Sequence, residues 1–106
     1  IVILCTCGSE TEAGKIALHL LEQRLAACVN VAPLTRRYYR WQGAIESAVE
    51  HLLLIKSSAA LFPAVQAAIR QVHSYEVPEL LALPVLDGST DYLNWLRANL
   101  RPVSEP

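Results

Sequence analysis

The sequence predicts one α+β domain spanning residues 1–106, with elements in the order β-α-β-β-α-β and a further helix at the C-terminus. Short apolar, β-branched runs alternate along it with segments of helical periodicity. A chain of 106 residues is long enough for one hydrophobic core, and a long hairpin pattern joins the second and third strands. This element order is the split βαβ, or ferredoxin-like, arrangement.

The first strand and helix are predicted from residues 1–24. Residues 1–7 form an apolar run ended by Gly8, which indicates a strand buried on both faces. Ser9 followed by Glu12 is a capping-box pattern, so a helix is expected to begin there. One face of this helix should lie on the core, because apolar residues recur at helical spacing. These residues are Ala13, Ile16, Ala17, Leu20 and Leu21.

The next two strands are predicted to form an unusually long hairpin. One strand covers residues 27–41, with a bend or bulge at Pro33, and the return strand covers residues 44–56. The dipeptide Gln42-Gly43 between them is typical of a tight turn. At about 3.3 Å per residue the first strand spans roughly 50 Å, whereas a domain of this size has a radius of gyration of about 13 Å. The hairpin tip is therefore expected to project from the domain.

The rest of the chain supplies a second helix, a fourth strand and a last helix. Ser57 or Ser58 is expected to cap a helix that runs to about His73. Residues 77–85 form the fourth strand, and the prolines near both of its ends favour an edge position or a boundary at each end. A last helix covers about residues 92–100, and residues 101–106 are expected to form a flexible tail.

Composition favours self-association over membrane insertion or nucleic-acid binding. The apolar fraction is 53%, above the roughly 45–50% of typical soluble domains. The longest apolar runs are far shorter than the roughly 18–20 residues of a membrane span, and a net charge of −1 does not select a polyanion. The helices of this architecture cover one sheet face, whereas three strands are apolar on both faces. The second face is therefore expected to need another subunit.

The three cysteines favour a reducing, cytoplasmic location. Cys5, Cys7 and Cys28 are odd in number and lie in apolar, strand-like segments, which suits free thiols better than disulfides. Cys5 and Cys7 face the same side of one strand, where they could share a soft metal or simply fill the core. The chain begins without a methionine, which is compatible with the loss of an N-terminal segment.

Six segments resemble the CutA family of divalent-ion tolerance proteins in order and spacing, and together they cover nearly the whole chain. They are residues 25–30, 39–43, 54–56, 73–79, 82–84 and 92–96. The resemblance implies a homotrimer linked to tolerance of copper and other divalent ions. It also implies that Cys5 and His73 are candidate metal ligands, because a thiol and a histidine at these places are connected with copper in related proteins. Ser74 departs from the family, which usually has proline there.

A second group of residues forms a predicted ligand cleft. His73 lies at a helix end beside Tyr75, Glu76 and Glu79, a cluster able to bind a cation or a polar ligand. The structural alternative for His73 is a favourable contact with the helix dipole. Lys56, at the end of the return strand, could receive an anionic ligand or be a solvated strand end.

Aromatic residues are predicted to form the subunit interface. Tyr39 and Trp41 share one face near the hairpin tip, and Trp95 lies on the last helix. The arginines within residues 36–40 interleave with aromatic residues, as in platforms that bind single-stranded nucleic acid. Pairing with Glu46 and Glu50 across the hairpin explains these arginines more simply, so neither a nucleic acid nor a membrane is expected as a partner.

The sequence therefore predicts a binding protein rather than an enzyme. In the leading hypothesis copper, another divalent cation or a small ligand binds at clefts between subunits in a sensor-like role, and no cofactor is required for folding. The alternatives are a scaffold protein and a small acylphosphatase-like hydrolase. The hydrolase is disfavoured because Gly8-Ser9-Glu10 is acidic and no nucleophile or phosphate loop accompanies Glu76 and Glu79.

Overall fold

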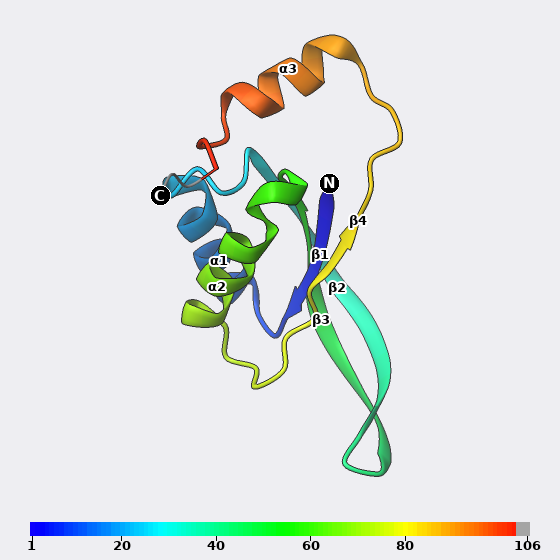
Figure 1. Ribbon diagram of the computed structural model, residues 1–106. Coiled ribbons are helices and arrows are strands. Elements are labelled where there is room, and N and C mark those ends of the chain that lie inside the picture. The colour runs from blue at the N-terminus through cyan, green and yellow to red at the C-terminus, as the bar shows by residue number, and fades with distance from the viewer. Residues whose placement is uncertain (104–106) are drawn as a thin grey trace.

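The computed structural model describes residues 1–103. Within this range the elements are β1 (Val2–Cys7), α1 (Glu10–Glu22), β2 (Cys28–Trp41), β3 (Ala44–Lys56), the 3-10 turn η1 (Ala59–Leu61), α2 (Phe62–Val72), β4 (Leu81–Leu83) and α3 (Thr90–Ala98). The strands form an antiparallel sheet in the order β2-β3-β1-β4. Figure 1 shows α1 and α2 on the same side of this sheet. The predicted ferredoxin-like fold with a C-terminal helix is confirmed.

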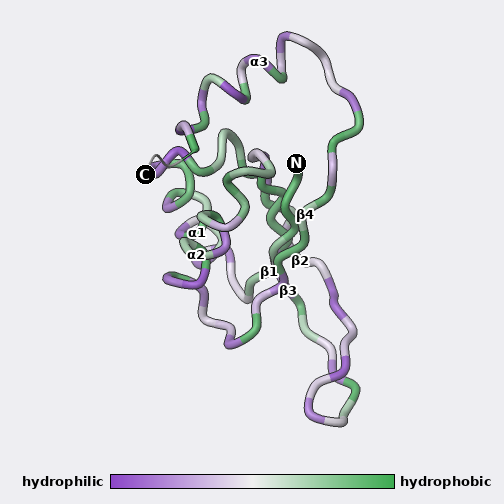
Figure 2. The backbone as a smooth tube through the Cα atoms, viewed as in Figure 1, coloured by the Kyte–Doolittle hydropathy of each residue, from purple (hydrophilic) through white to green (hydrophobic). Residues whose placement is uncertain are grey.

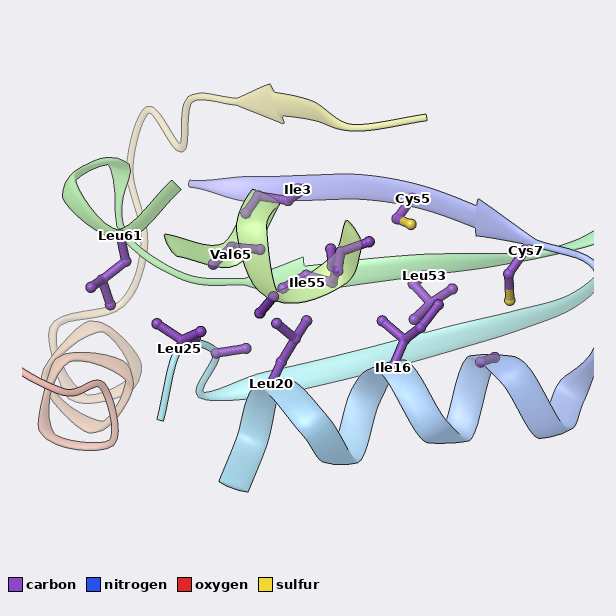
Figure 3. Packing of buried hydrophobic residues seen from close by; sticks show 14 of the residues in the cluster. Ile3, Cys5, Cys7, Ile16, Leu20, Leu25, Leu53, Ile55, Leu61 and Val65 are labelled. Carbon is purple, nitrogen blue, oxygen red and sulfur yellow. The ribbon is translucent and has the colours of Figure 1, made fainter. Parts of the chain in front are cut away.

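The core lies between the sheet and helices α1 and α2. Ser9 caps α1 as predicted, because its side chain accepts a hydrogen bond from the Glu12 backbone N–H. Alternate residues of β1 and β3 point toward the helices, where they meet apolar side chains of α1 and α2 (Figure 3). Fully buried members of this core are Ile3, Cys5, Ile16, Leu20, Leu53, Ile55, Val65 and Ile69.

The second helix begins later than the sequence predicts. Neither Ser57 nor Ser58 caps α2, and the chain enters that helix through η1, so that α2 begins at Phe62. The Ser57 hydroxyl instead donates a hydrogen bond of 2.6 Å to the Leu25 backbone carbonyl. That bond satisfies a polar group inside the domain, which explains why Ser57 is buried.

The fourth strand is shorter than predicted. Only Leu81–Leu83 pairs with β1, at the edge of the sheet. Pro78 and Pro84 lie on either side of this segment and cannot donate ladder hydrogen bonds, which accounts for the short strand. Beyond α3, the Arg101 backbone N–H donates to the Arg24 carbonyl at 2.8 Å, so the predicted tail is tied to the domain at its first residue. Residues 104–106 of that tail lie outside the described residues.

The β2–β3 hairpin projects from the domain as predicted (Figure 1). Its strands stay paired to the tip, with an extra residue in β2 between Ala32 and Thr35 where the bulge at Pro33 was expected. Gln42 and Gly43 have φ angles of 49° and 82°, the positive values that a two-residue type I′ turn requires. The described chain measures 43 × 31 × 24 Å.

The sheet face away from α1 and α2 carries an apolar surface, here called the open face. Its residues alternate along the strands with those that point into the core. Figure 2 shows that the strands are hydrophobic where they lie beside the helices. Leu81 is 55% exposed and Leu83 is 46% exposed, while the other apolar members are half-buried. The apolar members of the open face are Val2, Leu4, Leu52, Leu54, Leu81 and Leu83. Within residues 1–103, no helix is long and apolar enough to span a bilayer.

Candidate functional site

The bulge in β2 decides which hairpin residues share the open face. Ala32 lies opposite Leu52 before the bulge, and Thr35 lies opposite Glu50 after it. The extra residue therefore moves the odd-numbered side chains of β2 onto the face that the even-numbered ones occupy nearer the domain. The side chains brought to the open face in this way include Arg37, Tyr39 and Trp41.

A buried carboxylate connects the hairpin to the loop that follows α2. The Glu50 side chain is 0% exposed, and one of its oxygens lies 2.8 Å from Arg37 Nε. The Nε–H bond of Arg37 is poorly aligned for a hydrogen bond, so this contact is chiefly an ion pair. The other Glu50 oxygen accepts a hydrogen bond of 2.6 Å from the Tyr75 hydroxyl. Glu50 therefore fixes two side chains that belong to different elements.

Tyr75 acts as a hydrogen-bond donor in this arrangement. Burial of the phenol and its bond to the Glu50 carboxylate raise the pKa of Tyr75 well above its ordinary value, while the Arg37 charge opposes the shift. The hydroxyl consequently keeps its proton throughout the physiological range. The Tyr75 ring also lies against the His73 imidazole, with their centroids 4.8 Å apart.

A pocket of about 300 Å³, here called the hairpin pocket, lies between β2 and the loop after α2. One wall consists of the alternating side chains of β2, and the other consists of the loop. The lining residues are Arg37, Tyr39, Trp41, Ser74, Tyr75, Glu76 and Val77. The pocket therefore combines aromatic rings, one guanidinium and one exposed carboxylate, a set of groups that can bind a small polar ligand.

The loop side of the hairpin pocket is held in place by Glu12 of α1. One Glu12 oxygen accepts the Ser74 backbone N–H at 2.7 Å, and the other accepts the Ser74 hydroxyl at 3.1 Å. Both bonds depend on the serine at position 74, since a proline there would have neither group. Burial opposes ionisation of Glu12, but these two bonds, with a third from the Gly8 backbone N–H at 3.4 Å, outweigh it and lower the pKa of the carboxyl.

Replacing Glu12 with glutamine is expected to lower the free energy of unfolding at neutral pH by about 1–2 kcal/mol, because the charged acceptor of the hydrogen bonds from Ser74 and Gly8 is lost. The folded-state pKa of Glu12 lies below its ordinary value of 4.5, so its contribution is present above that value. The contribution is lost as the pH falls through the lowered pKa, and the two proteins should converge in acid. Urea unfolding at several pH values measures this, with exposed Glu22→Gln as the control. A difference that persists unchanged in acid would contradict it.

The candidate metal ligand His73 is engaged by backbone groups on both ring nitrogens. Nδ1 accepts the Tyr75 backbone N–H at 3.0 Å, and Nε2 lies 2.7 Å from the Thr6 carbonyl oxygen. These partners place the proton on Nε2, because an N–H can only donate and a carbonyl can only accept. Nδ1 also lies 3.5 Å from a Glu12 oxygen, but a nitrogen that accepts from Tyr75 cannot donate to that oxygen. The shorter contact, with the Tyr75 N–H, therefore makes Nδ1 a hydrogen-bond acceptor.

The candidate metal ligand Cys5 lies on the core side of β1. Burial, with smaller contributions from Cys7 and nearby carboxylates, raises the pKa of the Cys5 thiol to about 12, so the metal-binding thiolate is scarce at neutral pH. Cys7 shares the core side, as the sequence predicts. Among the described residues, no three histidine, cysteine, aspartate or glutamate side chains lie close enough together to hold a metal ion.

The predicted ligand-cleft residues do not all meet within the single chain. Tyr75 and Glu76 line the hairpin pocket. Lys56 is the last residue of β3, opposite Val2 and Cys28, and its ammonium group is hydrogen-bonded to the Asn30 side chain. Glu79 is half-buried just before β4. The described chain therefore places Lys56 away from the pocket.

The predicted interface residues remain accessible in the described chain. Trp41 is 40% exposed at the hairpin tip, and Tyr39 is half-buried beneath the Arg37 guanidinium, whose carbon lies 4.2 Å from the ring centroid. Trp95 is exposed on α3 and packs against Tyr92, with ring centroids 5.5 Å apart.

Arg37 and Glu50 are site residues that the sequence predicted only as a pair across the hairpin. A signal for Glu50 was present, because it precedes Leu52 and Leu54 with the same alternation as the open face. A charged residue continuing an apolar alternation indicates a buried ion pair. No comparable signal was available for Arg37, whose face depends on the bulge.

The topology, the projecting hairpin and the C-terminal helix define the chain as a small ferredoxin-like protein with an elongated β-ribbon. Comparison with known proteins is more specific. The chain belongs to the family described as CutA1 divalent ion tolerance protein, which matches residues 1–99. The resemblance identified in the sequence is thereby confirmed.

Individual relatives match over almost their full length. The chain is 46% identical over 98 residues to the divalent-cation tolerance protein CutA of Thermus thermophilus, covering 92% of this chain and 95% of that protein. A solved structure of the divalent cation tolerance protein Cut A1 from the same organism gives a TM-score of 0.92 at 45% identity, over 94% of this chain and 97% of that one. The periplasmic divalent cation tolerance protein CutA from Archaeoglobus fulgidus gives a TM-score of 0.91 at 35% identity, over 94% and 97% of the two chains.

Proposed function

We propose that the protein acts in divalent-cation tolerance as a homotrimer that binds a metal ion or a small ligand in clefts between its subunits. Its role is sensor-like rather than enzymatic. The observation that carries this proposal is the position of the hairpin pocket, because the β2 residues that line it share the open face, which a neighbouring subunit would cover. The family description supports the link to divalent ions.

The open face supports assembly. It presents a continuous apolar surface on neighbouring strands, and such surfaces on small proteins mark interaction sites. The hairpin reaches beyond the domain and carries Tyr39 and Trp41 on the same face, while Trp95 is exposed on α3. Aromatic residues of this kind are enriched at subunit interfaces.

The ligand is proposed to occupy a cleft that includes Tyr75 and Glu76 of one subunit. Lys56 and Glu79 would join such a cleft only where subunits meet, because neither residue lines the hairpin pocket of the single chain. Copper or another divalent ion at Cys5 and His73 is a second form of the same proposal. It requires the Cys5 thiol to lose its proton and His73 to release the Thr6 carbonyl.

A cytoplasmic location is part of the proposal. Cys5, Cys7 and Cys28 are free thiols in the structure, and thiols persist in this form in reducing compartments. The relative from Archaeoglobus fulgidus is described as periplasmic, so fractionation of cells that express the full protein tests this point directly.

Light scattering coupled to gel filtration tests the assembly. The wild-type protein is expected to show three times the chain mass of 11.7 kDa. Leu54 lies opposite Leu4 at the middle of the open face, so Leu54→Asp should reduce the measured mass by placing a charge inside the interface. Leu18→Asp, on the exposed side of α1, is the matched control and should keep the wild-type mass. A wild-type monomer at micromolar concentration would overturn the proposal.

A further inference from the structure

The charges around the hairpin pocket do not favour an anion. The Arg37 guanidinium already lies 2.8 Å from the fully buried Glu50 carboxylate, so these two groups neutralise one another. The remaining acidic side chain on the wall is the exposed carboxylate of Glu76. Glu76 and Glu50, which lies behind Arg37, would both repel an anionic ligand. A cation would instead be attracted.

The aromatic wall of the pocket already holds one cation. The guanidinium carbon of Arg37 lies 4.2 Å from the centroid of the Tyr39 ring, a cation–π contact. Trp41 is the next side chain on the same face of β2, and it lines the pocket as a residue that is 40% exposed. Tryptophan binds cations more strongly than other aromatic residues. The aromatic wall therefore leaves the Trp41 indole available to a second cation.

The same pocket offers few side-chain ligands to a divalent metal ion. Hard cations take several oxygen ligands, but the Ser74 hydroxyl donates to Glu12 at 3.1 Å and the Tyr75 hydroxyl donates to Glu50 at 2.6 Å. The Glu76 carboxylate is then the remaining acidic side-chain ligand among the lining residues. One carboxylate surrounded by aromatic rings matches the recognition of an alkylammonium group instead.

We propose that the hairpin pocket binds the positively charged head of a small organic cation, an alkylammonium group, between Trp41 and Glu76. The inference rests on the proposed ligand role of this cleft and names the class of its occupant. The volume of about 300 Å³ is at the lower end of the roughly 300–1,000 Å³ of ligand sites, so the ligand is small. Arg37 and Glu50 form the neutral floor of the site.

Calorimetric titration with choline tests the proposal. 3,3-Dimethyl-1-butanol has nearly the same shape without the charge and serves as the matched ligand control. Choline is expected to bind the wild-type protein and to bind about tenfold more weakly to Trp41→Leu, from loss of the cation–π contact. Glu76→Gln should weaken binding by a similar factor, and the neutral alcohol should bind far more weakly than choline.

Control variants separate the pocket from general surface effects. Tyr38→Leu removes an exposed aromatic ring from the same hairpin, and Glu22→Gln removes an exposed carboxylate from α1. Both should bind choline as the wild type does. Equal binding of choline and the neutral alcohol, or wild-type affinity in Glu76→Gln, would overturn the proposal.

Light scattering on the same samples distinguishes failure of the organic-cation inference from failure of the proposed function. A trimer that fails to bind choline overturns only the organic-cation inference and leaves the proposed function standing. A wild-type monomer overturns the proposed function itself. If Trp41→Leu alters the mass, Glu76→Gln still decides the inference, because a change from carboxylate to amide leaves the aromatic wall intact.

Discussion

Replacing Arg37 with methionine is expected to lower the free energy of unfolding by about 3–5 kcal/mol, the cost of leaving one member of a buried ion pair without its partner. The Glu50 side chain has no exposure to solvent, so water cannot replace the guanidinium. The Tyr75 hydroxyl would remain as its hydrogen-bond donor, but a neutral group does not compensate a buried charge. Guanidinium chloride unfolding at one protein concentration, followed by circular dichroism, measures the loss.

A double-mutant cycle shows whether the loss comes from Glu50. Arg37→Met combined with Glu50→Leu removes both charges, and the double variant should recover much of the stability because no ionised group is left buried. Arg36→Met replaces an exposed neighbour on the same strand and should change stability by less than about 0.5 kcal/mol. If Arg37→Met costs no more than Arg36→Met, the ion pair does not hold the hairpin.

The elements with strong periodicity could be predicted from the sequence. The apolar run of residues 1–7 became β1, the capping box at Ser9 began α1, and the return strand was predicted with the bounds Ala44–Lys56 that the structure has. Each of these signals is local and needs no knowledge of tertiary contacts. The start of α2 was missed because Ser57 forms a tertiary hydrogen bond with Leu25 instead of capping the helix.

The candidate site was only partly predictable, because its geometry depends on the bulge. Pro33 indicated an irregular strand, but the sequence does not reveal how many extra residues the bulge contains. One extra residue decides whether Arg37, Tyr39 and Trp41 face the helices or the open face. The grouping of Tyr75 with Glu76 followed from adjacency in the sequence, whereas contact between Tyr75 and Glu50 required the folded sheet.

Truncating Leu53 to alanine is expected to lower the free energy of unfolding by about 2–5 kcal/mol, from lost apolar burial and the cavity left behind. Leu53 is fully buried on the core side of β3, opposite Cys5 on one side and Val31 on the other, so its neighbours cannot collapse into the space without moving two strands. Leu18→Ala removes the same atoms from the exposed side of α1 and should cost less than about 0.5 kcal/mol. Chemical unfolding of both variants at one concentration makes the comparison, and equal losses would mean that the core is not organised around β3.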